Sequence, residues 1–136
     1  MVIKKECTGF VANRLAFALF REASSLVAQG VVDVKELDAI VTSSMGPRWS
    51  IAGPFKSYHA GGGEGGLASL LDKIGGTIQA CWDTSDEDVK REKIQIGEEW
   101  QKRICKQTDE EYGNVDTRER DFKTRKVLKA VAQKVE

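Results

Sequence analysis

The sequence has few of the residues that build disulfide frameworks or metal sites. Its three cysteines, Cys7, Cys81 and Cys105, are far apart and form no Cys-x-x-Cys pair, so we expect reduced thiols. His59 is the only histidine, and with no carboxylate cluster beside it a metal site is not expected. The chain also lacks a strand–Gly-x-Gly-x-x-Gly–helix unit, the usual signature of dinucleotide binding. We therefore expect no bound cofactor in this chain alone.

An excess of charge and a long apolar run are also missing. Lys plus Arg number 21, as do Asp plus Glu, which removes the broad positive field expected of a nucleic-acid binder. No apolar run reaches the roughly 18 residues that a membrane span needs, and the N-terminus has no signal-peptide core. We expect one domain, because 136 residues suffice for one core. We also expect a cytoplasmic location, with neither nucleic acid nor membrane as a partner.

The stretch from Phe10 to Gln29 predicts a helix that is apolar on nearly every side, ended by Gly30. A helix of this kind must be buried on every side. In a domain this small, either other helices enclose it or a partner subunit covers part of it. We expect a homodimer with an extensive apolar interface.

The rest of the chain predicts further helices and no strand after residue 9, so the expected fold class is all-α. Asp33 and Glu36 form a capping-box pattern for a helix that Gly46-Pro47 should stop. A short helical segment should follow Gly53-Pro54, and the glycine-rich run 61–66 should be a loop, because no strand precedes it as in a phosphate-binding loop. Three later helices are expected: one marked by Leu67, Leu70, Leu71 and Ile74; a long charged one capped by Ser85 with Val89, Ile96, Trp100 and Ile104 on its apolar face; and a last one capped by Asp116.

Asn13 is the first candidate for chemistry, because with Arg14 it interrupts the apolar helix. A buried amide without hydrogen-bond partners costs about 1–3 kcal/mol. Asn13 is therefore either a structural amide bonded to nearby backbone or a pocket residue that binds a substrate oxygen. The residues alone favour neither.

Arg48 is the second candidate, because it lies between two Gly-Pro helix breakers, on an expected loop. Its planar fork suits a carboxylate or phosphate, although stacking on Trp49 or pairing with a surface carboxylate is favoured by the residues alone. His59 could act as a general base, but no orienting partner can be placed for it. A structural histidine beside Tyr58 is the favoured interpretation.

Two motifs together carry a family resemblance. Gly9-Phe10-Val11-Ala12-Asn13-Arg14-Leu15, followed by Gly46-Pro47-Arg48-Trp49 and Gly53-Pro54-Phe55, resembles the C-terminal domain of L-3-hydroxyacyl-CoA dehydrogenases. The second motif resembles the branch that contains L-gulonate 3-dehydrogenase and lambda-crystallin. The resemblance is good from Val2 to about Leu71 and only general beyond.

The resemblance implies a helical domain of the 6-phosphogluconate dehydrogenase C-terminal-domain-like type in an intertwined dimer. It implies that residues 1–9 are the last strand and linker of a missing NAD-binding Rossmann domain, and that residues 10–136 are the helical domain. Asn13 then matches a residue that orients substrate, and Arg48, beside Trp49, matches one that binds a substrate carboxylate. His59 does not match the family's catalytic histidine, which lies in the absent half.

The leading hypothesis is a substrate-binding and dimerisation domain of a NAD-dependent 3-hydroxyacyl-CoA or 3-hydroxyacid dehydrogenase. Its substrate would be a small anionic or acyl compound, and a separate Rossmann domain is a possible partner. One alternative is a stand-alone helical interaction module. Another is a small cofactor-independent enzyme that reuses a pocket of Asn13 and Arg48, with His59 or Tyr58 in acid–base chemistry. We predict that Asn13 and Arg48 face one shared cavity.

Overall fold

The computed structural model describes residues 4–133, which form helices and no strand. In chain order these are α1 (Phe10–Ala28), α2 (Val34–Ile40), the π-helical turn η1 (Val41–Met45), α3 (Gly46–Ile51), α4 (Pro54–Gly61), the 3-10 turn η2 (Gly63–Gly65), α5 (Gly66–Arg91), α6 (Glu99–Tyr112) and α7 (Thr117–Ala132). The expected all-α class is confirmed. Met1, Val2 and Ile3 of the expected strand and linker lie outside the described residues, and residues 4–9 lead into α1 through bends and a turn.

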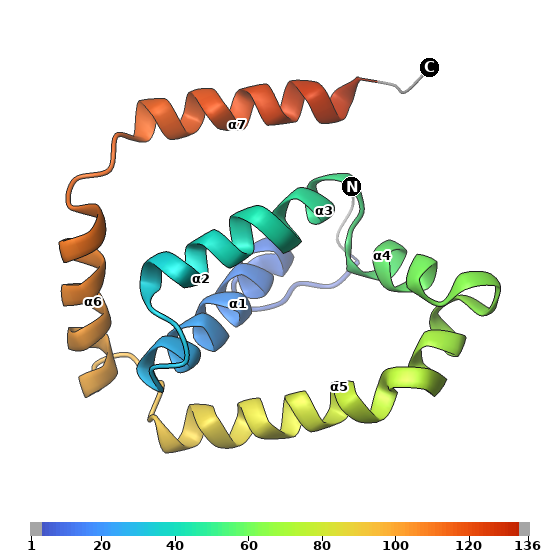
Figure 1. Ribbon diagram of the computed structural model, residues 1–136, viewed down its shortest axis with the longest axis horizontal. Coiled ribbons are helices and arrows are strands. Elements are labelled where there is room, and N and C mark those ends of the chain that lie inside the picture. Colours follow the sequence, from blue (N-terminus) through green and yellow to red (C-terminus); the bar gives the residue numbers. More distant parts are fainter. Residues whose placement is uncertain (1–3, 134–136) are drawn as a thin grey trace.

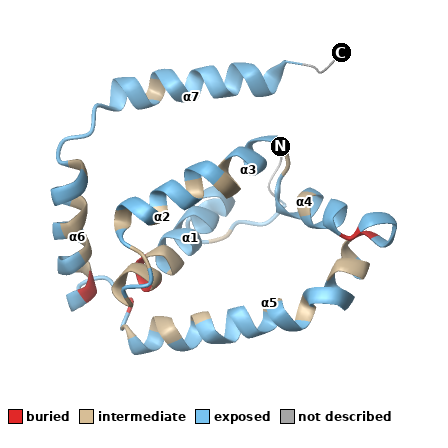
Figure 2. Ribbon diagram, viewed as in Figure 1, coloured by how far each residue is buried: buried red, intermediate tan, exposed pale blue. Residues whose placement is uncertain are grey.

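The helices form an open frame around α1 (Figure 1). The rod of α2, η1 and α3 runs back along α1, α5 crosses below this pair, and α6 closes one side. Few side chains are buried in this arrangement (Figure 2). The core of the described residues centres on Ser24, Ser25, Ile94 and Trp100, where the C-terminal half of α1 meets the turn between α5 and α6.

Local sequence explains where α1 ends and α2 begins. Gly30 has a left-handed φ of 74°, and the Val31 amide donates to the Leu26 carbonyl at 3.1 Å, a helix-ending glycine motif. Asp33 then caps α2: its carboxylate accepts from the Glu36 amide at 2.7 Å, and Glu36 accepts in return from the Asp33 amide at 2.9 Å. The expected capping box is confirmed.

The expectation that Gly46-Pro47 stops the second helix is wrong. The Gly46 amide donates to the Val41 carbonyl, five residues back, and this wider π turn carries the chain into α3. Pro47 then lies in the first turn of α3, where a helix needs no amide donor. Arg48 is therefore on a helix rather than on a loop.

The expected helix start at Ser85 is also wrong. Ser85 lies inside α5, and its hydroxyl donates to the Glu22 carboxylate of α1 in a short hydrogen bond. The break comes later, at residues 92–98, where Lys93 and Gly97 have positive φ. The Trp100 indole donates to the Gln95 carbonyl at 2.8 Å and closes this turn. Ile96 consequently lies in the turn and is exposed, rather than on the apolar face of a helix.

The expected enclosure of α1 by other helices is wrong for its first half. Phe10, Leu15, Phe17 and Phe20 are all more than half exposed in the single chain. Only the second half, from Glu22 to Gln29, is partly or fully covered. Of the two explanations offered for an apolar helix, coverage by a partner subunit therefore remains as the prediction.

Candidate functional site

Asn13 lies in the first turns of α1 and is exposed. Its side chain makes no hydrogen bond with another residue among those that the structure describes. The expectation that Asn13 sits in a helix buried by the chain itself is wrong, and so is its interpretation as an amide bonded to neighbouring backbone. The amide is free to bind a ligand, and its role in orienting substrate remains a prediction.

Arg48 and Trp49 lie on α3, and both are exposed. Among residues 4–133 Arg48 has no salt bridge, and the cation–π contact found there joins Lys126 to Phe122 instead. Neither of the structural roles considered for Arg48, stacking on Trp49 or pairing with a carboxylate, is present. The guanidinium is available for an anionic group.

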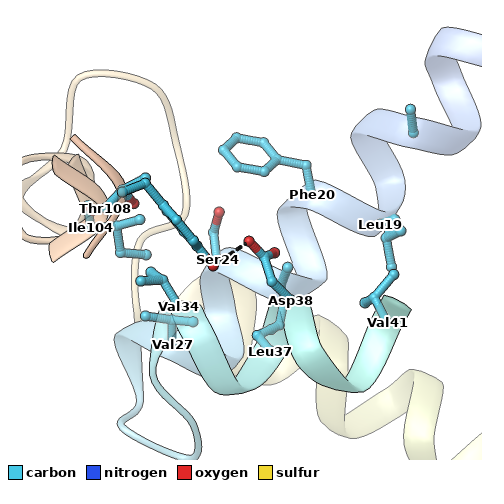
Figure 3. A pocket seen from close by; sticks show the side chains of 13 residues that line it. Leu19, Phe20, Ser24, Val27, Val34, Leu37, Asp38, Val41, Ile104 and Thr108 are labelled. Carbon is cyan, nitrogen blue, oxygen red and sulfur yellow. Dashed lines mark hydrogen bonds between the residues drawn. The ribbon is translucent and has the colours of Figure 1, made fainter. Parts of the chain in front are cut away.

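The antiparallel course of α1 and the α2–η1–α3 rod brings Asn13 and Arg48 toward the same end of the pair. Leu19 of α1 and Val41 of η1 lie at one level along it (Figure 3). Asn13 lies six residues before Leu19, and Arg48 lies seven residues after Val41. At 1.5 Å of rise per residue both steps cover roughly 10 Å in the same direction. That both side chains face one cavity remains a prediction, and neither of the two cavities below is lined by them.

His59 has a structural contact. It lies on α4, and its Nδ1 accepts a hydrogen bond from the Leu67 amide at 3.2 Å, at the start of α5. Its ring lies directly over Gly66, where an added Cβ would come within 2.3 Å of the ring. This geometry favours the structural interpretation of His59, which fixes the turn between α4 and α5.

The glycine-rich run 61–66 does not fit NAD. It joins α4 to α5 through the η2 turn, so two helices flank it rather than a strand and a helix. The Gly62 Cα lies so close to the Gly66 backbone that a Cβ there would come within 1.6 Å of the Gly66 carbonyl oxygen. The run is thus a tight turn closed on itself, with no open row of amides for a pyrophosphate.

An apolar groove opens between α1, α2 and α6 (Figure 3). It has a volume of about 360 Å³, which is in the range of small-ligand cavities. Leu19, Phe20, Leu37 and Ile104 are among its walls. No sequence pattern predicts this groove, because it depends on how three separate helices meet.

Four polar side chains line this groove, those of Ser24, Asp38, Thr108 and Tyr112. The Tyr112 hydroxyl donates to the Asp38 carboxylate at 2.7 Å, and this hydrogen bond, with the negative charge of Asp38, raises the pKa of Tyr112 to about 12. The Ser24 hydroxyl is buried and has no hydrogen-bond partner among the described residues. Ser24 also borders a second apolar cavity, against Phe17, Ile94 and Trp100.

Polar contacts hold α6 against α2 beside the groove. The Gln107 side chain accepts from the Val34 amide at 3.0 Å, so it caps the first turn of α2 from another helix. Lys35 and Glu111 form an ion pair at 2.8 Å, which raises the pKa of Lys35 through its hydrogen bond to Glu111. These contacts between α6 and α2 therefore hold two walls of the groove in place.

No group of three or more potential metal ligands is found among residues 4–133. No helix in that part of the chain is long and apolar enough to cross a bilayer.

The geometry defines a class: an all-helical domain whose longest apolar helix is half uncovered and whose candidate ligand-binding side chains are exposed. A family model described as 3-hydroxyacyl-CoA dehydrogenase, C-terminal domain, matches residues 9–106. The chain belongs to this family.

Known relatives agree with this assignment. An L-carnitine dehydrogenase from Streptomyces griseus is 43% identical over 82 residues, which are 60% of this chain and 24% of the relative. One from Oceanobacillus iheyensis is 38% identical over 104 residues, 76% of this chain and 32% of the relative. A 3-hydroxyacyl-CoA dehydrogenase from Gibberella moniliformis is 35% identical over 101 residues, 73% of this chain and 30% of the relative. The matches span about a quarter to a third of these relatives. No solved structure matches the chain.

Proposed function

We propose that the chain is the substrate-binding and dimerisation domain of a NAD-dependent dehydrogenase that acts on a 3-hydroxyacyl or 3-hydroxyacid substrate. The family match over residues 9–106 carries this proposal. NAD, which accepts the hydride in such enzymes, would be held by a Rossmann domain outside this chain, since the glycine run here does not fit it.

A small 3-hydroxy acid with a free carboxylate is the substrate class that the exposed side chains suit best. Relatives named L-carnitine dehydrogenase act on such a molecule, a 3-hydroxy acid with a carboxylate. The unpaired Arg48 fork would bind the carboxylate bidentately. Asn13 would hold a neutral oxygen, and Trp49 would add an apolar wall. An acyl-CoA substrate is the second possibility within the family.

The dimerisation role is supported by the uncovered half of α1. Phe10, Leu15, Phe17 and Phe20 are each more than half exposed, and large exposed apolar patches mark interaction sites. Obligate dimer interfaces resemble a core cut in half, and α1 has this character because it is apolar along its length but covered only in its second half. The same observation favours the alternative of a stand-alone interaction module, in which the dimer would have no catalytic partner.

Complementation separates these two functions. The chain is mixed with the separately produced NAD-binding domain of an L-carnitine dehydrogenase, and NADH formation from L-carnitine is followed at 340 nm. The proposal predicts turnover that needs both components and falls with Arg48→Ala. An Arg91→Ala chain is the control, because Arg91 lies at the C-terminal end of α5, away from α3, which carries Arg48. Turnover by the NAD-binding domain that is unchanged by any form of this chain would contradict the proposal and favour the interaction module.

A further inference from the structure

The last helix, α7, has no partner. It projects from the end of α6 and packs substantially on no other described helix (Figure 1). Thr124, Val127, Leu128 and Val131 nevertheless recur at helical spacing on one side of it, and Leu128 is 62% exposed. A helix of 16 residues without tertiary packing is only marginally stable in water. This apolar stripe therefore needs a surface to cover it.

The groove between α1, α2 and α6 is likewise an apolar surface that is left open in the single chain. Its walls are aliphatic and aromatic, with Leu19, Phe20, Leu37, Val41 and Ile104 facing an open volume of about 360 Å³. The unpaired Ser24 hydroxyl lies among them. An amphipathic helix laid in an apolar groove is a common recognition mode, read by anchors spaced three and four residues apart.

Charge supports the pairing of these two surfaces. Residues 117–132 contain six Lys or Arg and two acidic residues, a net charge of +4, whereas residues 1–116 contain 14 basic and 18 acidic residues, a net charge of −4. The segments 33–38 and 106–112, which flank the groove, carry six acidic and two basic residues. Lys123 and Arg125 border the apolar stripe of α7 at 100° per residue. Opposite charges across a contact fix its register and discourage wrong partners.

We propose that α7 is an exchanged arm, whose apolar stripe docks into the α1–α2–α6 groove of a second copy while that copy's α7 docks in return. The occupant is a second copy, because the exposed half of α1 already calls for a second copy to cover it. The three apolar side chains of one α7 stripe could not cover both the groove and α1. The linker, residues 113–116, joins α7 to the end of α6, and α7 lies apart from α1 and α2 of its own chain (Figure 1). This proposal rests on the dimerisation proposed above. Since α7 lies beyond the matched residues 9–106, the family match does not supply it.

Disulfide trapping tests the contact in the 136-residue chain. In a background with Cys7, Cys81 and Cys105 changed to Ser, a Leu128→Cys chain is mixed with an isotope-labelled Val41→Cys chain and mildly oxidised. Mass spectrometry then counts disulfides between unlike chains. Phe122→Cys is the matched control, because Phe122 lies on the side of α7 opposite the stripe. We expect at least ten times more mixed disulfide for Leu128→Cys than for Phe122→Cys.

A second variant measures the contribution of the arm to association. Leu128→Asp should raise the dimer dissociation constant at least tenfold, and Phe122→Asp should leave it within about twofold. Both side chains are exposed in the single chain, so neither change opens a cavity within it. Phe122→Asp removes only the cation–π contact with Lys126, and circular dichroism checks that both variants stay helical.

Each other outcome overturns the exchanged arm. If a Leu128→Cys/Val41→Cys double variant forms its disulfide within one chain, α7 folds back on its own groove. Equal mixed disulfide for the Leu128→Cys and Phe122→Cys chains would mean that the stripe selects nothing. A dimer that survives Leu128→Asp and forms no mixed disulfide would refute the arm but leave dimerisation through α1 in place. A monomer would refute both.

Discussion

The turn between α4 and α5 depends on Gly66, and substitution by alanine tests that dependence. Gly66 has φ 57° and ψ −149°, a backbone conformation that is essentially restricted to glycine. A Cβ at this position would lie 2.3 Å from Cε1 and 2.7 Å from Nδ1 of His59, far inside van der Waals contact. The ring would have to move, and its hydrogen bond from Leu67 would break.

These two effects set the magnitude. The strained backbone costs about 1–3 kcal/mol, and the lost hydrogen bond about 0.5–1.5 kcal/mol, at the low end because it is exposed. We therefore expect Gly66→Ala to lower the free energy of unfolding by about 2–4 kcal/mol. In a His59→Ala background the clash and the hydrogen bond are already gone, so the further cost of Gly66→Ala should fall to the backbone contribution alone.

Urea unfolding followed by far-ultraviolet circular dichroism measures these differences. Gly76→Ala is the matched control, because Gly76 lies inside α5 and an added Cβ there meets nothing within 4 Å. In a helix this change should stabilise by about 0.5–1 kcal/mol. If Gly66→Ala proved as harmless as Gly76→Ala, the described geometry of the turn and the structural role of His59 would both be refuted.

Three further predictions concern the site and the groove. In a complemented enzyme, Arg48→Ala should weaken binding of carboxylate substrates by about 1.5–3 kcal/mol, and Asn13→Ala should lower kcat more than it raises KM. Because both residues are exposed, the melting temperature of each variant should match that of the parent chain. Unfolding of either variant would argue against a substrate role. Isothermal calorimetry should detect no micromolar NAD binding to the chain alone, and a measurable micromolar affinity would contradict the assignment of NAD to another domain. In a Tyr58→Phe chain, the tyrosinate absorbance of Tyr112 at 295 nm should rise with a midpoint near pH 12, and Asp38→Asn should shift that midpoint toward 10, whereas an unchanged midpoint would refute the assignment. Because the pKa of Tyr112 is raised in the folded state, the contribution of this hydrogen bond to stability should be complete below pH 10 and lost as the pH rises toward 12.

The sequence predicted those elements whose signals are local. Gly30 ends α1 and Asp33 caps α2 through contacts within a few residues, so the pattern of residues was sufficient. Gly46-Pro47 misled because a π turn removes the conflict between proline and a continuing helix. Ser85 misled because its hydroxyl bonds to Glu22, 63 residues away, and serine in a sequence does not reveal whether its partner is local.

The candidate site was predictable only through the family motifs. Composition and spacing left the roles of Asn13 and Arg48 open, and the motifs supplied the substrate assignment. The groove had no sequence signal, because its walls come from three helices that are separated along the chain. The hydrogen bond from Tyr112 to Asp38 spans 74 residues. Such contacts follow from packing, which a helical period does not specify.

Sedimentation equilibrium of the chain at tens of micromolar tests most directly the central claim, that a second copy covers the apolar helix α1. Each chain has a mass of 15.0 kDa. We predict a single species of twice that mass, because the exposed face of α1 and the groove beside it both lack a cover within one chain. A species at 15.0 kDa across this concentration range would contradict the claim.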